Sequence, residues 1–592
     1  MIKISDKICK GLISFEQKSG LLLFTAVVIT FISLSSCTET SAKDHENKGP
    51  FKYREIFLPE GIGANADRLN LNTLDEDWGI WGHNIAKVIP EEHSHNIYAK
   101  VNGSTMKKQY CFSSNHLFEY IDEYIDRHYD EDERIRFAIV PNDNDIVCLC
   151  EKCVKAGNTK GNASPAVNKL VRKLAHKFPG HIFFTSDYRT TRGLPRDSMP
   201  ANTGVLLSAI NFPLSAVPTP EETRFVNRIK AWSQTTPRIL IWDYINNFDD
   251  YFTPYPILGP MQRRFQNYRD NKVTALFLNG SGNDVSSLSR LHTEILAALT
   301  EDPELDWKYL LKEKARAIYP VTGELIAEYM IAQEDNLAQK GVSLPLYDGV
   351  EKARKTYLDE EQFIKFHNNL LKLRHKTTGV EKDEIDTLLG QLALTRMELN
   401  RINGNPLESE KYIADLERLT RKGVLGYNES GWSIESYIND YRYLMNHYRD
   451  SSKGNKLKGV RLTPLTALDP DYSDISILTD GVLGIPSNYH NGNMIVSPQS
   501  YTQIALPNNL NLSKIRVWMS YNPAYKIKLP ESVSLRGGGR EIKNIQPSYP
   551  ANLSGHSYVE FDVPKGINGS LVLTFNKEED TKSFAIEEIE GY

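Results

Sequence analysis

The spacing of apolar residues changes twice along the chain and divides it into three regions. From residue 51 to residue 301, short β-rich apolar runs alternate with helices that carry one apolar stripe. Eight strands that alternate with helices over about 250 residues are typical of an α/β protein with a (β/α)8 TIM barrel, and we predict this fold. The predicted strands are Lys52–Phe57, Trp78–His83, Lys108–Phe112, Ile135–Val140, His181–Asp187, Gly204–Ala209, Arg238–Asp243 and Val273–Leu278.

The other two regions have different periodicities. From residue 302 to residue 450, apolar residues recur at helical spacing, as in the stripe of Phe363, Phe366 and Leu370, and this predicts a helical region packed against the barrel. From residue 451 to residue 592, short alternating strands are separated by Pro, Gly and Asn, which predicts a β-sandwich.

The amino-terminal segment has the pattern of a lipoprotein signal peptide. Four lysines precede an uncharged apolar run, and small residues then lead to Cys37. The run of about 14 residues is shorter than the roughly 20 that a membrane-spanning helix needs. We therefore predict a signal peptide over residues 1–36, lipidation of Cys37 and a flexible tether over residues 37–50. The protein is then expected to be exported and anchored by lipid to a bacterial membrane, which we take to be the outer membrane.

Composition excludes some partners and some chemistry. A formal net charge of −5 over 592 residues gives no electrostatic basis for binding nucleic acid. The sequence contains no Gly-x-Ser-x-Gly motif and no phosphate-binding loop, so an esterase or a kinase is not favoured. No metal-binding motif of a known catalytic kind is present, and we predict neither a catalytic metal nor a cofactor.

Carboxylates follow three of the predicted barrel strands, at the ends where barrel enzymes hold their active sites. They are Asp143, Asp187 and Asp243. Glycosidic cleavage needs one carboxyl group as a proton donor and a second as nucleophile or water-activating base. We expect Asp143 to be the acid, because the apolar run before it could raise its pKa, with Asp243 as its partner and Asp187 in reserve.

Polar and aromatic residues at the same strand ends could bind a sugar. The predicted substrate-binding residues are His83, Tyr188, Trp242, Tyr244 and Asn279. Aromatic rings can stack on a sugar ring, although such rings also pack in protein cores. An aspartate after a strand is also a common turn residue, so position alone does not establish catalysis.

Four further cysteines are expected to have a structural role near Asp143. They are Cys111, Cys148, Cys150 and Cys153. Exported proteins form disulfides, and four thiolates also suit a structural zinc ion. Buried free thiols are the third possibility, and connectivity cannot be read from sequence.

Several short motifs together resemble the family called domain of unknown function 4838. They are Arg54-Glu55, Arg68-Leu69-Asn70, Gln109–Ser113, Pro141-Asn142-Asp143 with the cysteines after it, and Trp242-Asp243-Tyr244. The resemblance covers roughly residues 51–320 and implies a TIM-barrel hydrolase of carbohydrate, with Asp143 matching the acidic position of the family.

The third region resembles discoidin-type modules, which often bind glycans. The resemblance rests on Leu478–Gly481 and on Tyr501–Leu506. The whole chain is therefore expected to be an exported, lipid-anchored glycoside hydrolase that acts on a carbohydrate substrate. The alternative is a non-catalytic glycan-binding lipoprotein built on a barrel scaffold.

Overall fold

The computed structural model describes residues 49–91, 96–451, 454–497, 499–508, 510–550, 554–567, 569–577 and 583–592. The predicted signal peptide, Cys37 and nearly all of the predicted tether lie outside these residues. Among the described helices, none combines the length and the apolar character that crossing a membrane would require.

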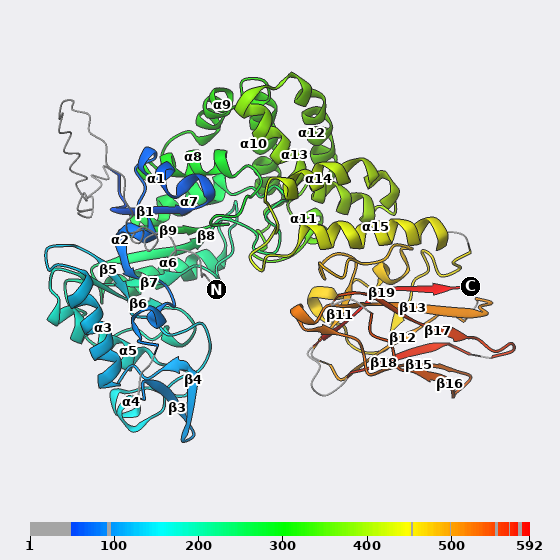
Figure 1. Cartoon of the computed structure of the whole chain (residues 1–592), viewed down its shortest axis with the longest axis horizontal. Helices are drawn as coiled ribbons and strands as arrows, with labels where there is room; N and C mark the ends of the chain where they lie inside the picture. The colour runs from blue at the N-terminus through cyan, green and yellow to red at the C-terminus, as the bar shows by residue number, and fades with distance from the viewer. Residues whose placement is uncertain are drawn as a thin grey trace, which may run out of the picture. The chain divides into compact units, whose positions relative to one another are not determined.

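The first region contains a curled parallel sheet of seven strands (Figure 1). Its strand order is β1-β9-β8-β7-β6-β5-β2. One cluster of apolar side chains takes members from all seven strands, including Tyr53, Trp78, Phe184, Leu240 and Phe277, so the sheet curls around an inner core. The strands are β1 Tyr53–Phe57, β2 Trp78–Ile80, β5 Arg136–Ala138, β6 Ile182–Asp187, β7 Thr203–Ser208, β8 Ile239–Tyr244 and β9 Ala275–Asn279.

The two edges of this sheet, β1 and β2, meet through side chains. Among the described residues no backbone ladder joins them. Instead the indole N–H of Trp78 donates to the hydroxyl of Tyr53 over 2.9 Å, and the two rings pack edge to face. The ladder is therefore open at this point, whereas a barrel closed by hydrogen bonds was expected.

The predicted third barrel strand is not part of the sheet, which corrects the expected count of eight strands. Its first three residues, Lys108 to Tyr110, belong to β4 (Ser104–Tyr110), which pairs antiparallel with β3 (Tyr98–Val101) in a separate hairpin. A central strand of a parallel sheet is buried on both faces and therefore apolar. Most of β4 is exposed and it includes Lys107 and Lys108, so it suits a solvated hairpin.

Amphipathic helices follow most of the strands and cover the outer face of the sheet. They are α3 Asn115–His128, α5 Ser164–Lys177, α6 Pro220–Ser233, α7 Leu258–Asp270 and α8 Ser289–Glu301, with the shorter α1 Ala64–Arg68, α2 Leu74–Asp77 and α4 Glu151–Ala156. Helix α6 begins where the hydroxyl of Thr219 accepts a hydrogen bond from the N–H of Glu222 and proline occupies its first turn.

The second region is helical, as its periodicity predicted. Its helices are α9 Trp307–Ile318, α10 Gly323–Lys340, α11 Val350–Lys355, α12 Glu360–Leu373, α13 Gly379–Ile402, α14 Glu410–Arg421 and α15 Ile434–Ser451. Their apolar faces belong to the same core cluster as Val205 and Ile241 of the sheet. The helices and the curled sheet therefore share one core.

The third region contains two antiparallel sheets. The first has the order β10-β12-β18-β15-β16, and the second β11-β19-β13-β17, with β14 added parallel to β19. Side chains of both sheets, such as Val533 and Ile586, form one apolar cluster. The strands are β10 Thr463–Pro464, β11 Met494–Val496, β12 Tyr501–Ala505, β13 Lys514–Tyr521, β14 Ile527–Lys528, β15 Ser532–Gly537, β16 Arg540–Ile545, β17 Gly555–Asp562, β18 Val572–Asn576 and β19 Ser583–Gly591.

Candidate active site

A cavity of about 220 Å³ opens at the carboxyl ends of the parallel strands. Residues that end or follow β2, β5, β6, β7, β8 and β9 line its wall. Parallel strands direct their carboxyl ends to one side of a curled sheet, and this is where barrel enzymes bind substrates. The cavity contains six of the eight residues that the sequence assigned to catalysis or substrate binding, namely His83, Asp143, Tyr188, Trp242, Tyr244 and Asn279.

Asp143 lies on the loop after β5, and its carboxylate is 55% exposed. Arg189 forms an ion pair with it over 3.3 Å and also pairs with Asp145 over 2.7 Å. The apolar residues before Asp143 were expected to desolvate it, but they point into the cores on the two faces of the sheet. Asp143 therefore faces the cavity without the apolar surroundings expected of an acid.

The loop that carries Asp143 is anchored to the hairpin. The side-chain amide of Gln109 donates to the carbonyl of Asn142 over 3.1 Å, and the N–H of Asn142 donates back to Gln109 over 3.0 Å. On the other side, Nδ1 of His83 donates to the carbonyl of Pro141. These contacts fix the backbone on both sides of the turn that places Asp143.

Aromatic rings form much of the cavity wall. Trp242 stacks on Trp81 with ring centroids 4.9 Å apart and an interplanar angle of 11°. Its indole N–H is buried and has no acceptor among the described residues. The hydroxyl of Tyr244 lies 3.2 Å from that of Ser208, and burial raises its pKa, so it stays protonated at neutral pH.

Asp243 does not reach the cavity. Its carboxylate is 1% exposed and forms an ion pair with Arg264 of α7. It also accepts hydrogen bonds from the hydroxyl of Tyr268 over 2.6 Å and from the N–H of Tyr244 over 2.9 Å. The side chain of Asp243, expected as the second catalytic carboxylate, therefore points to the helices and does not line the cavity.

Asp187 has the same orientation on β6. It pairs with Arg228 and accepts a hydrogen bond from the indole N–H of Trp232, and both partners lie on α6. Successive side chains of a strand point to opposite faces. Tyr188, the next residue, lines the cavity, so Asp187 faces away from it.

A second carboxylate reaches the cavity from the helical region. Glu429 lies on the loop between α14 and α15, and its side chain lines the cavity that also holds Asp143. Its N–H donates to the carbonyl of Phe248 over 2.9 Å, and the N–H of Tyr251 donates to the carbonyl of Tyr427 over 2.9 Å. This loop is therefore pinned to the segment that follows β8.

The surroundings of Glu429 favour its protonated form. Loss of hydration in the site raises the pKa of its carboxyl group, and the negative charges of Asp249 and Asp143 raise it further. Tyr347, from the segment between α10 and α11, completes this side of the cavity, and burial raises its pKa to about 12. Neither residue was selected from the sequence, because both lie in the region expected only to support the barrel.

The four cysteines converge at a separate place. Their Sγ atoms all lie within 4.8 Å of one another, and all four are free thiols. None of them lines the cavity that holds Asp143.

Comparison with curated proteins found no match. Among solved structures, the chain is similar to a family GH115 4-O-methyl-alpha-glucuronidase with specificity for decorated arabinogalactans, at 10% identity and a TM-score of 0.36, over 82% of this chain and 68% of that one. It is also similar to a GH138 enzyme targeting pectin rhamnogalacturonan II, at 10% identity and a TM-score of 0.29, over 80% of this chain and 76% of that one. A lectin domain of lectinolysin, complexed with Lewis B antigen, is similar at 13% identity and a TM-score of 0.18, over 24% of this chain and 96% of that one.

One family model matches the part of the chain that contains the curled sheet. It is described as "Domain of unknown function (DUF4838)" and covers residues 43–331. Tyr347 and Glu429 lie beyond this match, whereas the six cavity residues that the sequence predicted lie within it. The DUF4838 family model therefore matches residues 43–331, which confirms the resemblance seen in the sequence motifs.

Proposed function

We propose that this chain is a glycoside hydrolase in which Asp143 and Glu429 are the two catalytic carboxyl groups. The observation that carries the proposal is that both line one cavity at the carboxyl ends of the parallel strands. Most glycosidases cleave the glycosidic bond between a pair of carboxyl groups that flank it. The two residues come from different regions of the chain, as they would if they faced a substrate from two sides.

The two carboxyl groups take different roles in this mechanism. Glu429, whose pKa is raised, donates its proton to the glycosidic oxygen as the bond to the leaving group breaks. Asp143 either attacks the anomeric carbon or removes a proton from the water that attacks it. In both cases its negative charge stabilises the positive charge that develops on the sugar ring.

The remaining wall suits a single sugar ring. The cavity of about 220 Å³ is smaller than the roughly 300–1,000 Å³ of most ligand pockets. Tyr188, Trp242 and Tyr244 offer faces for stacking. We therefore propose that the enzyme binds one sugar unit of a glycan here, with Asn279 and His83 contacting its hydroxyl groups.

The experiment compares the wild-type chain with Asp143→Asn and Glu429→Gln on a panel of aryl glycosides and plant or bacterial polysaccharides. Loss of an acid or base group is expected to lower kcat by about 10²–10⁴-fold. The matched control is Glu435→Gln, which removes an exposed carboxylate on α15 outside the cavity. Turnover that neither cavity variant reduces would contradict the proposal.

A second reading is supported by the ion pair between Asp143 and Arg189, because a carboxylate held by a cation need not react. The chain would then bind a glycan without cleaving it. Calorimetric binding of a panel glycan by the wild type, with no product released during long incubation, favours this reading over the enzyme.

We also propose that the chain is exported and anchored by lipid at Cys37. The pattern of residues 1–37 supports this anchor. Cys37→Ala is expected to move the protein from the membrane fraction to the soluble fraction and to abolish incorporation of labelled fatty acid. A variant that stays membrane-bound and labelled would contradict lipidation at this cysteine.

A further inference from the structure

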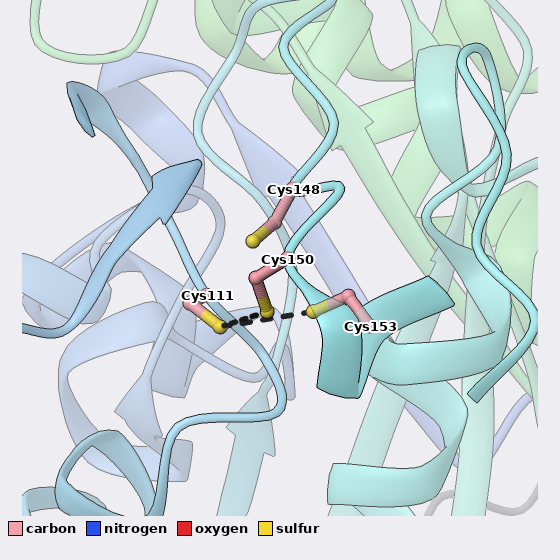
Figure 2. Close-up of side chains that lie close together, drawn as sticks. All are labelled: Cys111, Cys148, Cys150 and Cys153. Atoms are coloured by element: carbon pink, nitrogen blue, oxygen red, sulfur yellow. Dashed lines mark hydrogen bonds between the residues drawn. The ribbon is translucent and has the colours of Figure 1, made fainter. Parts of the chain in front are cut away.

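Four cysteines from two separate segments of the chain converge at the base of the loop that carries Asp143. Cys111 directly follows β4, Cys148 lies in the loop after β5, and Cys150 and Cys153 belong to the start and the body of α4. Figure 2 shows their thiols directed toward one another. The Sγ atom of Cys111 lies 3.6 Å from that of Cys150 and 3.7 Å from that of Cys153.

These distances match the geometry of a tetrahedral metal site. Zinc binds thiolates at about 2.3 Å, so two sulfur ligands of a tetrahedral site lie about 3.8 Å apart. The whole group spans at most 4.8 Å between sulfur atoms, which leaves room for one ion at its centre. A disulfide would need two sulfur atoms at about 2.05 Å, and all four cysteines are instead free thiols.

We propose that Cys111, Cys148, Cys150 and Cys153 bind one zinc ion as a structural site. On binding, each thiol releases its proton to solvent, so that Zn²⁺ and four thiols give a tetrathiolate complex and four protons. A backbone donor supports the resulting charge, because the N–H of Lys100 points to Sγ of Cys148 over 3.3 Å. Four protein ligands leave no open position, which is typical of a structural rather than a catalytic zinc.

The position of the site indicates what the ion would hold together. Cys111 is two residues from Gln109, whose side chain hydrogen-bonds the backbone of Asn142 next to Asp143. Cys148 lies five residues beyond Asp143 on the same loop. Zinc would therefore join the β3–β4 hairpin, this loop and α4 into one unit that fixes the turn at Asp143. The zinc site itself does not depend on the proposed hydrolase activity.

The test measures metal content by mass spectrometry of the elements in the full chain, purified without added metal. We expect one zinc ion per wild-type chain and about tenfold less or lower in Cys150→Ser. Lys152→Ala is the matched control, since it changes an exposed side chain between two of the cysteines and should keep one zinc ion. The thiols of Cys111, Cys148, Cys150 and Cys153 should become reactive only after a chelator removes the metal.

A second measurement covers the case in which the serine variants fail to fold. Wild-type chain produced with cobalt in place of zinc should show the visible absorption bands of a tetrahedral cobalt thiolate site. A purified wild-type chain that holds no metal and has all four cluster thiols reactive would overturn the proposal. So would a chain in which none of these four thiols reacts and the mass is lower by four hydrogens, which indicates two disulfides, or stoichiometric iron in place of zinc.

Discussion

Asp143 and Glu429 share a cavity but differ in what surrounds them. Both are exposed, but Asp143 forms an ion pair with the guanidinium of Arg189. Glu429 loses hydration in the site and lies near other negative charges, which raises its pKa. Such a difference between two carboxyl groups is what separates the acid from its partner in glycosidases.

This difference predicts a pH dependence for hydrolysis. A general acid acts only when protonated, and the protonated fraction of Glu429 falls as pH rises through its raised pKa. We expect kcat/KM to fall on the alkaline side with an apparent pKa above 4.5, the ordinary value for glutamate. The measurement is a pH profile of the wild type and of Glu429→Gln.

The variant should lose this alkaline limb. It should also retain more activity on an aryl glycoside with a good leaving group than on one with a poor leaving group, because a good leaving group needs little protonation. If kcat/KM of Glu429→Gln fell on the alkaline side as it does in the wild type, the general acid would be another residue.

Strand alternation explains the placement of three aspartates that looked equivalent in sequence. On β8, Leu240 belongs to the inner core and Ile241 to the outer one. Asp243 is two residues from Ile241, so it points to the same outer face, where it pairs with Arg264. Trp242 and Tyr244 point to the opposite face and line the cavity. The alternation of side chains along a strand does not apply to Asp143, because this residue lies beyond the end of its strand.

The outward position of Asp243 predicts a stability effect rather than a catalytic one. Asp243→Ala leaves the buried charge of Arg264 without its partner, which should lower the free energy of unfolding by about 3–5 kcal/mol. The double variant Asp243→Ala/Arg264→Ala should lose less than the sum of the two single variants. Urea unfolding measures the stability.

The folded fraction of Asp243→Ala should keep a kcat close to that of the wild type. If Asp243→Ala instead lost as much kcat as Glu429→Gln while its stability stayed unchanged, Asp243 would be one of the two catalytic carboxyl groups.

At the scale of the molecule, one core extends through all three regions. The apolar cluster that includes Ile241 of the sheet and Leu392 of α13 also includes Trp518 of β13. The third region is held to α15 through Glu590, whose side chain is 3% exposed. Its carboxylate accepts from Nε2 of His447 over 2.9 Å and from the indole N–H of Trp518 over 2.9 Å.

This contact predicts a pH-dependent contribution to stability. Burial would raise the pKa of Glu590, but its hydrogen bonds to His447 and Trp518 hold it below the ordinary value of 4.5. Because the pKa is lower in the folded state, the contribution is present above pH 4.5 and is lost as pH falls through the lowered value. Glu590→Gln should therefore cost about 1.5–3 kcal/mol at pH 7 and progressively less below pH 4.5.

Thermal unfolding of both forms over this pH range measures the effect. The matched control, Glu541→Gln, changes an exposed carboxylate on β16 and should unfold like the wild type. A stability difference for Glu590→Gln that does not shrink in acid would contradict the assigned contact.

Local pattern was sufficient for the kinds of elements and for part of the site. Short β-rich apolar runs predicted β1, β2 and β5 to β9, and helical spacing predicted the second region. Strand ends led to His83, Asp143, Tyr188, Trp242, Tyr244 and Asn279, because the carboxyl ends of parallel strands converge wherever such a sheet curls.

The orientation of Asp187 and Asp243 could not be read in the same way. A parallel sheet covered by helices is apolar on both faces. The strand sequences therefore do not show which side chains point to the inner face and which to the outer face. Likewise, the entry of Glu429 into the cavity and the meeting of Cys111 with Cys148, Cys150 and Cys153 depend on segments far apart in the chain. Short-range periodicity specifies the elements, whereas these contacts exist only after the elements pack, and packing supplied both the second carboxylate and the cluster of thiols.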